Sequence, residues 1–179
     1  MQHLILVVLF VLIIGLLITV TRWPGGLHMT FSQHAATSRQ SKIFYALLFL
    51  ITLPLLMWFF VEWLVPTKNL PIVFLWFATV AVIFQILCTL IPEDGGVRTV
   101  IHRTLTGISG IAMLPLVLIL VLSPGISTYA TATSCAALLL MMILLSVALK
   151  NQKDYPYALT LQVGYYVAFF IAILASTYL

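Results

Sequence analysis

Four side chains of this sequence have the chemistry to hold a metal ion or to support hydrolysis: His28, His34, Asp94 and His102. Imidazole nitrogens and carboxylate oxygens are ligands that zinc takes when they converge. An aspartate and a histidine can also act together as acid and base on a bound substrate. The spacing matches no HExxH or CxxC motif. We therefore expect no metal or cofactor and no catalytic residue. The alternative is a zinc site built from these four side chains, with Asp94 and His102 catalytic.

A second group of polar side chains falls within apolar stretches, where polar residues are most informative. His102, Thr106 and Ser109 are spaced i, i+4 and i+7, which places them on one face of a helix. Gln85 and Gln162 lie on two other stretches. The five residues predict a polar ligand cavity, although such side chains also join helices without binding any ligand. Gly107 and Gly110 predict close approach of another helix beside that face.

The elements that must position these residues are membrane-spanning helices. Hydrophobic residues make up 63% of the 179 positions and charged residues only 7%. A soluble domain carries about a quarter charged residues, so a soluble enzyme is excluded. Crossing a membrane takes about 20 apolar residues. Six stretches meet or approach that length, at 4–20, 43–65, 70–91, 105–122, 127–149 and 157–178. We expect one all-α domain, a polytopic bundle of six transmembrane helices with short loops.

Basic residues predict the orientation of the bundle, because they favour the cytoplasmic side. Loops 21–42, 92–104 and 150–156 carry every lysine and arginine except Lys68. We expect these loops in the cytoplasm and both termini on the other side, in a bacterial inner membrane. Four of the basic residues could form a rim for a lipid headgroup, or could act only as topology determinants: Arg98, Arg103, Lys150 and Lys153.

The longest loop also has a pattern of its own. Apolar and polar residues alternate from Leu27 to Ser32. A period of two predicts an extended segment with one apolar face. Because an unpaired backbone is costly in lipid, we expect this segment to lie as a lid across the cytoplasmic end of the bundle. Thr37, Ser38 or Ser41 can then cap the following helix.

Two segments resemble a known family. Residues 30–36 with 41–44 (TFSQHAA and SKIF) resemble its segment before the second helix, and residues 91–94 with 101–102 (IPED and IH) resemble its segment leading into the fourth. The family is the six-helix membrane proteins of domain of unknown function 998, which are related to the DRAM/Sfk1-like proteins. The resemblance implies the six-helix fold. The wider group is distantly similar to membrane hydrolases that use Ser, Asp and His with a metal, which again implies Asp94 and His102.

We interpret the chain as an integral membrane protein that binds a lipid or small amphipathic molecule in a polar cavity on the cytoplasmic side. The first alternative is a metal-dependent hydrolase embedded in the membrane, and the second is a small transporter. Membrane lipid is the expected partner and nucleic acid is not, because the eight basic residues are few and scattered. The sequence leaves homo-oligomerisation open.

Overall fold

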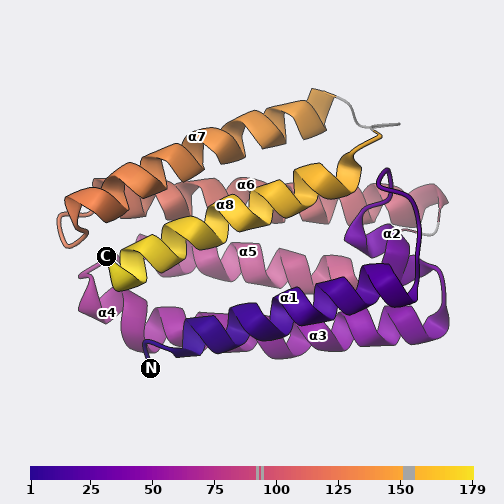
Figure 1. The fold of residues 1–179 in the computed structure, drawn as a ribbon, viewed down its shortest axis with the longest axis horizontal. Coiled ribbons are helices and arrows are strands. Elements are labelled where there is room, and N and C mark those ends of the chain that lie inside the picture. Colours follow the sequence, from indigo (N-terminus) through magenta and orange to yellow (C-terminus); the bar gives the residue numbers. More distant parts are fainter. Residues whose placement is uncertain (92, 94, 151–155) are drawn as a thin grey trace.

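The fold is an all-helical bundle in a computed structural model that describes residues 1–91, 93, 95–150 and 156–179 (Figure 1). No strand occurs among these residues. The elements are α1 (Leu4–Arg22), α2 (Phe31–Ala36), α3 (Arg39–Phe59), η1 (Phe60–Leu64), α4 (Val65–Thr67), α5 (Val73–Leu90), α6 (Gly96–Leu122), α7 (Thr128–Lys150) and α8 (Ala158–Tyr178).

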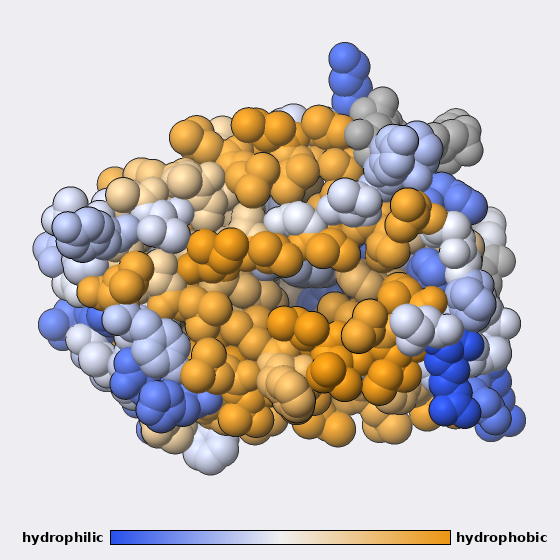
Figure 2. Space-filling view, in the orientation of Figure 1, coloured by the Kyte–Doolittle hydropathy of each residue, from blue (hydrophilic) through white to orange (hydrophobic). Residues whose placement is uncertain are grey.

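Six helices are long and apolar enough to cross a membrane, which confirms the predicted number of spans. The second span is one continuous helix from Arg39 to Thr67, because α3 passes through the π-helical turn η1 into α4. Apolar side chains are exposed around the bundle, among them Phe10, Trp76 and Ile143. A surface of this kind suits lipid rather than water (Figure 2). The chain is therefore an integral membrane protein.

The helices pack in the order α1, α3, α5, α6, α7, α8, each against the next, and α6 also contacts α8. The first and last helices of this series make no extensive contact with each other. Figure 1 shows α1 and α8 running side by side in the same view, with α5 behind the space between them. At this seam, α1 and α8 are neighbours that are not packed along their length.

Two ends of the bundle differ in charge. We call the end that carries Arg22, Arg39 and Lys42 the basic end; the start of α6 and the end of α7 lie there as well. Lys68 and the residues next to both termini lie at the opposite end. Apart from Lys68, the basic residues that the structure describes thus lie at one end, as predicted. Which end faces the cytoplasm stays a prediction.

Helix α6 begins earlier than the sequence indicated. The predicted span starts at residue 105, but the helix starts at Gly96, so nine residues assigned to a loop are helical. Gly95 and Gly96 have positive φ angles of 111° and 54°, a conformation in which glycine is favoured. The chain therefore turns sharply before the helix. His102 and Arg103 then stand on a helix rather than in a loop.

Candidate functional site

The basic end is organised around one carboxylate, Glu93, whose side chain is only 5% exposed. One carboxylate oxygen accepts hydrogen bonds from the hydroxyls of Ser32 at 3.0 Å and Thr30 at 3.3 Å. The other accepts from the Gln33 amide at 3.3 Å and from Nε of Arg103 at 2.8 Å. A buried carboxylate needs such donors, because an unpaired buried charge is costly. Glu93 therefore ties the first loop to the start of α6.

Two of these donors, Ser32 and Gln33, lie on α2, and a third, Thr30, is its N-cap. The Thr30 hydroxyl accepts from the backbone N–H of Gln33, and the Gln33 side chain accepts from the N–H of Thr30. This reciprocal capping box satisfies two N–H groups and starts a helix. The extended prediction for residues 27–32 is thus wrong, because residues 27–29 form a turn and a bend and residues 31–32 belong to α2. Ser38 caps α3 in the same way with Ser41, as predicted.

Helix α8 also contacts the segment around α2, in addition to Glu93. The Gln162 side chain accepts a hydrogen bond from the backbone N–H of Phe31 at 3.0 Å, and the N–H of Leu159 donates to the Leu27 carbonyl at 3.1 Å. The N-terminal end of α2 thus has backbone contacts with α8 as well as side-chain contacts with Glu93. Segment 27–36 lies at the basic end of the bundle, where a lid was expected (Figure 1).

The predicted metal ligands are spread out where the structure describes them. His28 is exposed, whereas His34 is buried and its Nδ1 donates to the Trp23 carbonyl at 2.9 Å. The remaining ring nitrogen of His34 is buried without a partner. Asp94 lies outside the described residues. Within the described ranges, no group of three or more His, Cys, Asp or Glu side chains could hold a metal ion.

His102, the other residue predicted to be catalytic, is 4% exposed and fixed by one strong contact. Its Nδ1 lies 2.7 Å from the Ile91 carbonyl oxygen. A carbonyl only accepts, so Nδ1 carries the proton and Nε2 keeps its lone pair. The hydrolase prediction depends on Asp94 as well as His102, so it stays a prediction.

The five predicted cavity residues do not line one cavity. Ser109 donates to the Ala81 carbonyl at 2.9 Å and lies 3.3 Å from Oε1 of Gln85. Thr106 donates back to the His102 carbonyl at 2.9 Å, and so makes a local bond within α6. The structure therefore joins Gln85 and Ser109 at one place and leaves His102 at another, while Gln162 holds α2.

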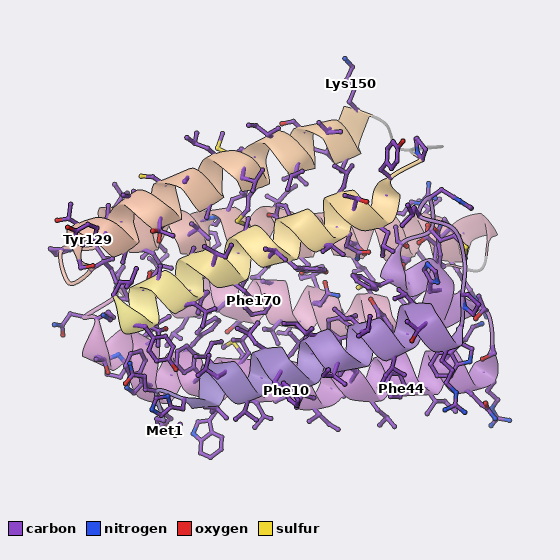
Figure 3. The ribbon with its side chains drawn as sticks, in the orientation of Figure 1. Met1, Phe10, Phe44, Tyr129, Lys150 and Phe170 are labelled. Carbon is purple, nitrogen blue, oxygen red and sulfur yellow. The ribbon has the colours of Figure 1, made fainter. Side chains whose placement is uncertain are left out.

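Gln85 and Ser109 line a groove at the seam between α1 and α8, which we call the α1–α8 groove. Figure 2 shows a hollow between these two helices, with hydrophilic atoms at its base and apolar atoms along its walls. The cavity volume is about 50 Å³. The walls include Leu12 and Leu16 of α1 and Phe169 and Phe170 of α8. Phe170 lies between the two helices in Figure 3.

A third polar residue, Tyr166, joins the base of the groove. Its hydroxyl donates to Oε1 of Gln85 at 3.3 Å. Oε1 thus accepts from Tyr166, while the single hydroxyl hydrogen of Ser109 goes to the Ala81 carbonyl. Among the described residues, no protein acceptor takes the two hydrogens on Nε2 of Gln85. Gln85 therefore brings to the lining of the groove an amide donor that has no assigned acceptor in the described part of the chain.

A second cavity, of about 170 Å³, lies at the basic end, and we call it the basic-end cavity. It is formed by α2, the first turns of α3, the end of α5 and the start of α6. Its lining includes Lys42, Ile43, Tyr45, Leu90 and His102. It is larger and more polar than the groove, and only His102 of the predicted cavity residues lines it.

The described members of the predicted headgroup rim lie in different surroundings. Arg98 is exposed near the start of α6, and Arg103 is half exposed but bonded to Glu93. Lys150 extends away from the bundle at the end of α7 (Figure 3). Lys153 lies outside the described residues. The described members of this group do not surround either cavity.

Gly107 and Gly110 of α6 do not have the predicted role. A Cβ atom added at Gly107 or Gly110 would meet no atom within 4 Å, so no helix approaches closely there. The close approach occurs elsewhere. A Cβ at Gly15 would lie 2.5 Å from the Leu48 side chain, and one at Gly125 would collide with the Lys68 carbonyl oxygen.

No protein-family model, no curated protein and no solved structure matches this chain. The resemblance to the domain of unknown function 998 therefore stays a prediction.

Proposed function

We propose that this membrane protein binds a lipid or small amphipathic molecule in the α1–α8 groove. One observation carries the proposal: an apolar groove opens sideways between two spanning helices and has a hydrogen-bond donor at its base. The apolar chain of the ligand lies against Leu12, Leu16 and Phe169. An oxygen of the ligand accepts from Nε2 of Gln85.

The polar base, rather than the apolar walls, decides what binds. Lipid tails are as apolar as leucine, so exchanging one tail for another against the walls gains little. An amide donor without an acceptor in this setting costs about 1–3 kcal/mol. A ligand that supplies an acceptor oxygen removes that cost. The groove therefore favours a molecule with a carbonyl or hydroxyl oxygen over a plain hydrocarbon chain.

The depth of Gln85 limits where that oxygen lies. Five residues separate Gln85 from Leu90, the last residue of α5. At 1.5 Å per residue this is about 7.5 Å along the helix. The acceptor oxygen of the ligand must therefore lie about 7.5 Å deeper in the bundle than the end of α5. A single-chain amphipath with a small polar end can do so more easily than a phospholipid with a bulky headgroup.

A photoreactive fatty acid tests the proposal. The probe carries a diazirine at mid-chain and is irradiated with the protein in phosphatidylcholine nanodiscs, and the labelled peptides are identified by mass spectrometry. We expect labels on Leu12, Leu16 and Phe169 above those on Ile143, which faces outward on α7. Equal labelling of all outward-facing helices would contradict the proposal.

Two variants sharpen this test. Ala81→Leu places a larger side chain in the groove, whereas Ala132→Leu makes the same change at an exposed position on α7. We expect Ala81→Leu to remove the groove labels and Ala132→Leu to leave them. Gln85→Leu removes the donor and should reduce groove labelling about fivefold or more, as the loss of one hydrogen bond allows. Unchanged labelling in both groove variants would refute the assignment.

A further inference from the structure

The basic-end cavity contains two buried polar groups without an assigned partner in the described part of the chain: the Tyr45 hydroxyl and Nε2 of His102. Both residues line the cavity, and they are 3% and 4% exposed. Buried polar atoms in proteins nearly always have a hydrogen-bond partner. The two groups therefore point to a molecule that occupies this cavity.

Tyr45 lies on the first turns of α3, and its ring packs against Phe49 with centroids 4.9 Å apart. No residue in the described part of the chain bonds to its hydroxyl, yet that oxygen is not among the enclosed atoms that lack a partner. It is therefore open to the cavity. A phenol at this position can donate to an oxygen of a bound molecule.

His102 complements that donor with an acceptor. Its Nδ1 hydrogen is committed to the Ile91 carbonyl, so the ring is held in one orientation. Nε2 is the ring nitrogen that remains, and it too is not enclosed. In the neutral ring it accepts a hydrogen bond. The cavity thus offers a donor and an acceptor, both on rigid helices.

The charge and the apolar rim of the cavity narrow the choice of ligand. Lys42 lines the cavity and brings a cation. Two more lining residues, Ile43 and Leu90, are about half exposed on the outer surface of α3 and α5. A ligand in the cavity therefore has a charged part near Lys42 and an apolar part that continues along the bundle.

We propose that the basic-end cavity is a binding site for the headgroup of a phospholipid. The phosphate accepts from the Tyr45 hydroxyl and interacts with the Lys42 ammonium. A hydroxyl of the headgroup donates to Nε2 of His102, and the acyl chains lie over Ile43 and Leu90. A volume of 170 Å³ has room for about six water molecules at about 30 Å³ each, and so for a small headgroup. The site therefore prefers phosphatidylglycerol, which has hydroxyl donors, over phosphatidylcholine, which has none.

Native mass spectrometry tests this site with two lipids. Delipidated protein in a polyoxyethylene detergent is titrated with phosphatidylglycerol or phosphatidylcholine, and the fraction with one bound lipid gives each Kd. Tyr45→Phe removes the phosphate donor and should weaken both lipids about tenfold, as expected for a hydrogen bond to a charged group. Tyr129→Phe is the control, because Tyr129 is 81% exposed at the opposite end.

His102→Asn separates the two contacts of the histidine. The asparagine Nδ2 stands where the imidazole Nδ1 was and can still donate to Ile91, but the variant has no counterpart of Nε2. We expect phosphatidylglycerol to bind about fivefold more weakly and phosphatidylcholine to be unchanged, which reduces the preference. This variant distinguishes headgroup recognition from a loss of structure, because misfolding would weaken both lipids alike.

Three results would overturn the proposal. The first is equal binding by Tyr45→Phe and Tyr129→Phe, and the second is an equal loss of both lipids in His102→Asn. The third is binding of inorganic phosphate that depends on Tyr45 while lipid binding does not, which would assign the cavity to a free anion. Ala81→Leu should leave these lipid affinities unchanged, because it alters only the α1–α8 groove. The two proposals can therefore fail independently.

Discussion

The Glu93 carboxylate makes a quantitative prediction about the stability of α2. Glu93→Gln keeps the size of the side chain but removes its charge and replaces one acceptor oxygen by a donor. The Ser32 bond, at 3.0 Å, is of the kind worth about 1.5–3 kcal/mol when the acceptor is charged. The two bonds at 3.3 Å add less. The Arg103 pair adds at most about 1 kcal/mol, because that side chain is 46% exposed.

The glutamine retains one acceptor, so only part of this sum is lost. We expect the free energy for local opening of α2 to fall by about 2 kcal/mol, which corresponds to a factor of about 30. Hydrogen exchange of the Gln33 and His34 amides, followed by mass spectrometry, should therefore accelerate about 30-fold in the variant. These amides report on α2 because both bond to Thr30.

Glu62→Gln provides the matched control. Glu62 is an exposed carboxylate in η1, near the opposite end of the bundle from α2. We expect this variant to leave exchange in α2 unchanged. If Glu93→Gln and Glu62→Gln give the same exchange rates in α2, then Glu93 does not hold the segment, and the energy assigned to its hydrogen bonds is refuted.

Three further predictions concern the rest of the bundle. Gly125→Ala should lower the free energy of unfolding by more than about 1 kcal/mol, because the added Cβ would meet the Lys68 carbonyl. Gly107→Ala should raise it by about 0.5–1 kcal/mol, because alanine has the higher helix propensity and the Cβ meets no other atom. Unfolding in SDS measures both free energies, and equal effects of the two variants would contradict the packing. Tyr165→Phe should cost about 0.5–1.5 kcal/mol in the same assay, since its hydroxyl donates to the Gly110 carbonyl at 2.6 Å; a neutral effect would show that this bond adds nothing. A reporter fused after Leu179 should be active on the non-cytoplasmic side, and activity in the cytoplasm would reverse the predicted orientation.

The spans were predictable because each is a long apolar run, and a run of about 20 apolar residues is the length that a bilayer core requires. Their polar ends were not. The first two turns of α6 contain Arg98, Thr99 and His102, so hydropathy alone placed the start of the helix at residue 105. A helix that leaves the apolar layer continues without an apolar signal, and only Gly95–Gly96 marked its beginning.

The candidate sites were predictable only in part. Gln85 and Ser109 stood out as polar residues in apolar runs, and they do meet. Glu93 looked like an ordinary turn residue beside Pro92, because its partners lie about 60 positions earlier in the chain. Tyr45 was overlooked for a different reason. A tyrosine in a spanning helix is common, and its significance depends on whether a neighbour takes its hydroxyl, which a single sequence does not reveal.

The unpacked seam between α1 and α8 has a consequence for how the bundle assembles during synthesis. Helix α1 emerges first of the six and finds its main neighbour, α3, at once. The side of α1 that faces α8 has no neighbouring helix until α8 has been synthesised. Then Gln2 donates to the Thr177 carbonyl at 3.1 Å, and segment 27–36 meets the start of α8. The groove is thus the last boundary to form, and lipid is already present on both of its sides while it closes. A ligand can therefore be enclosed during biogenesis, without any later opening of the finished bundle.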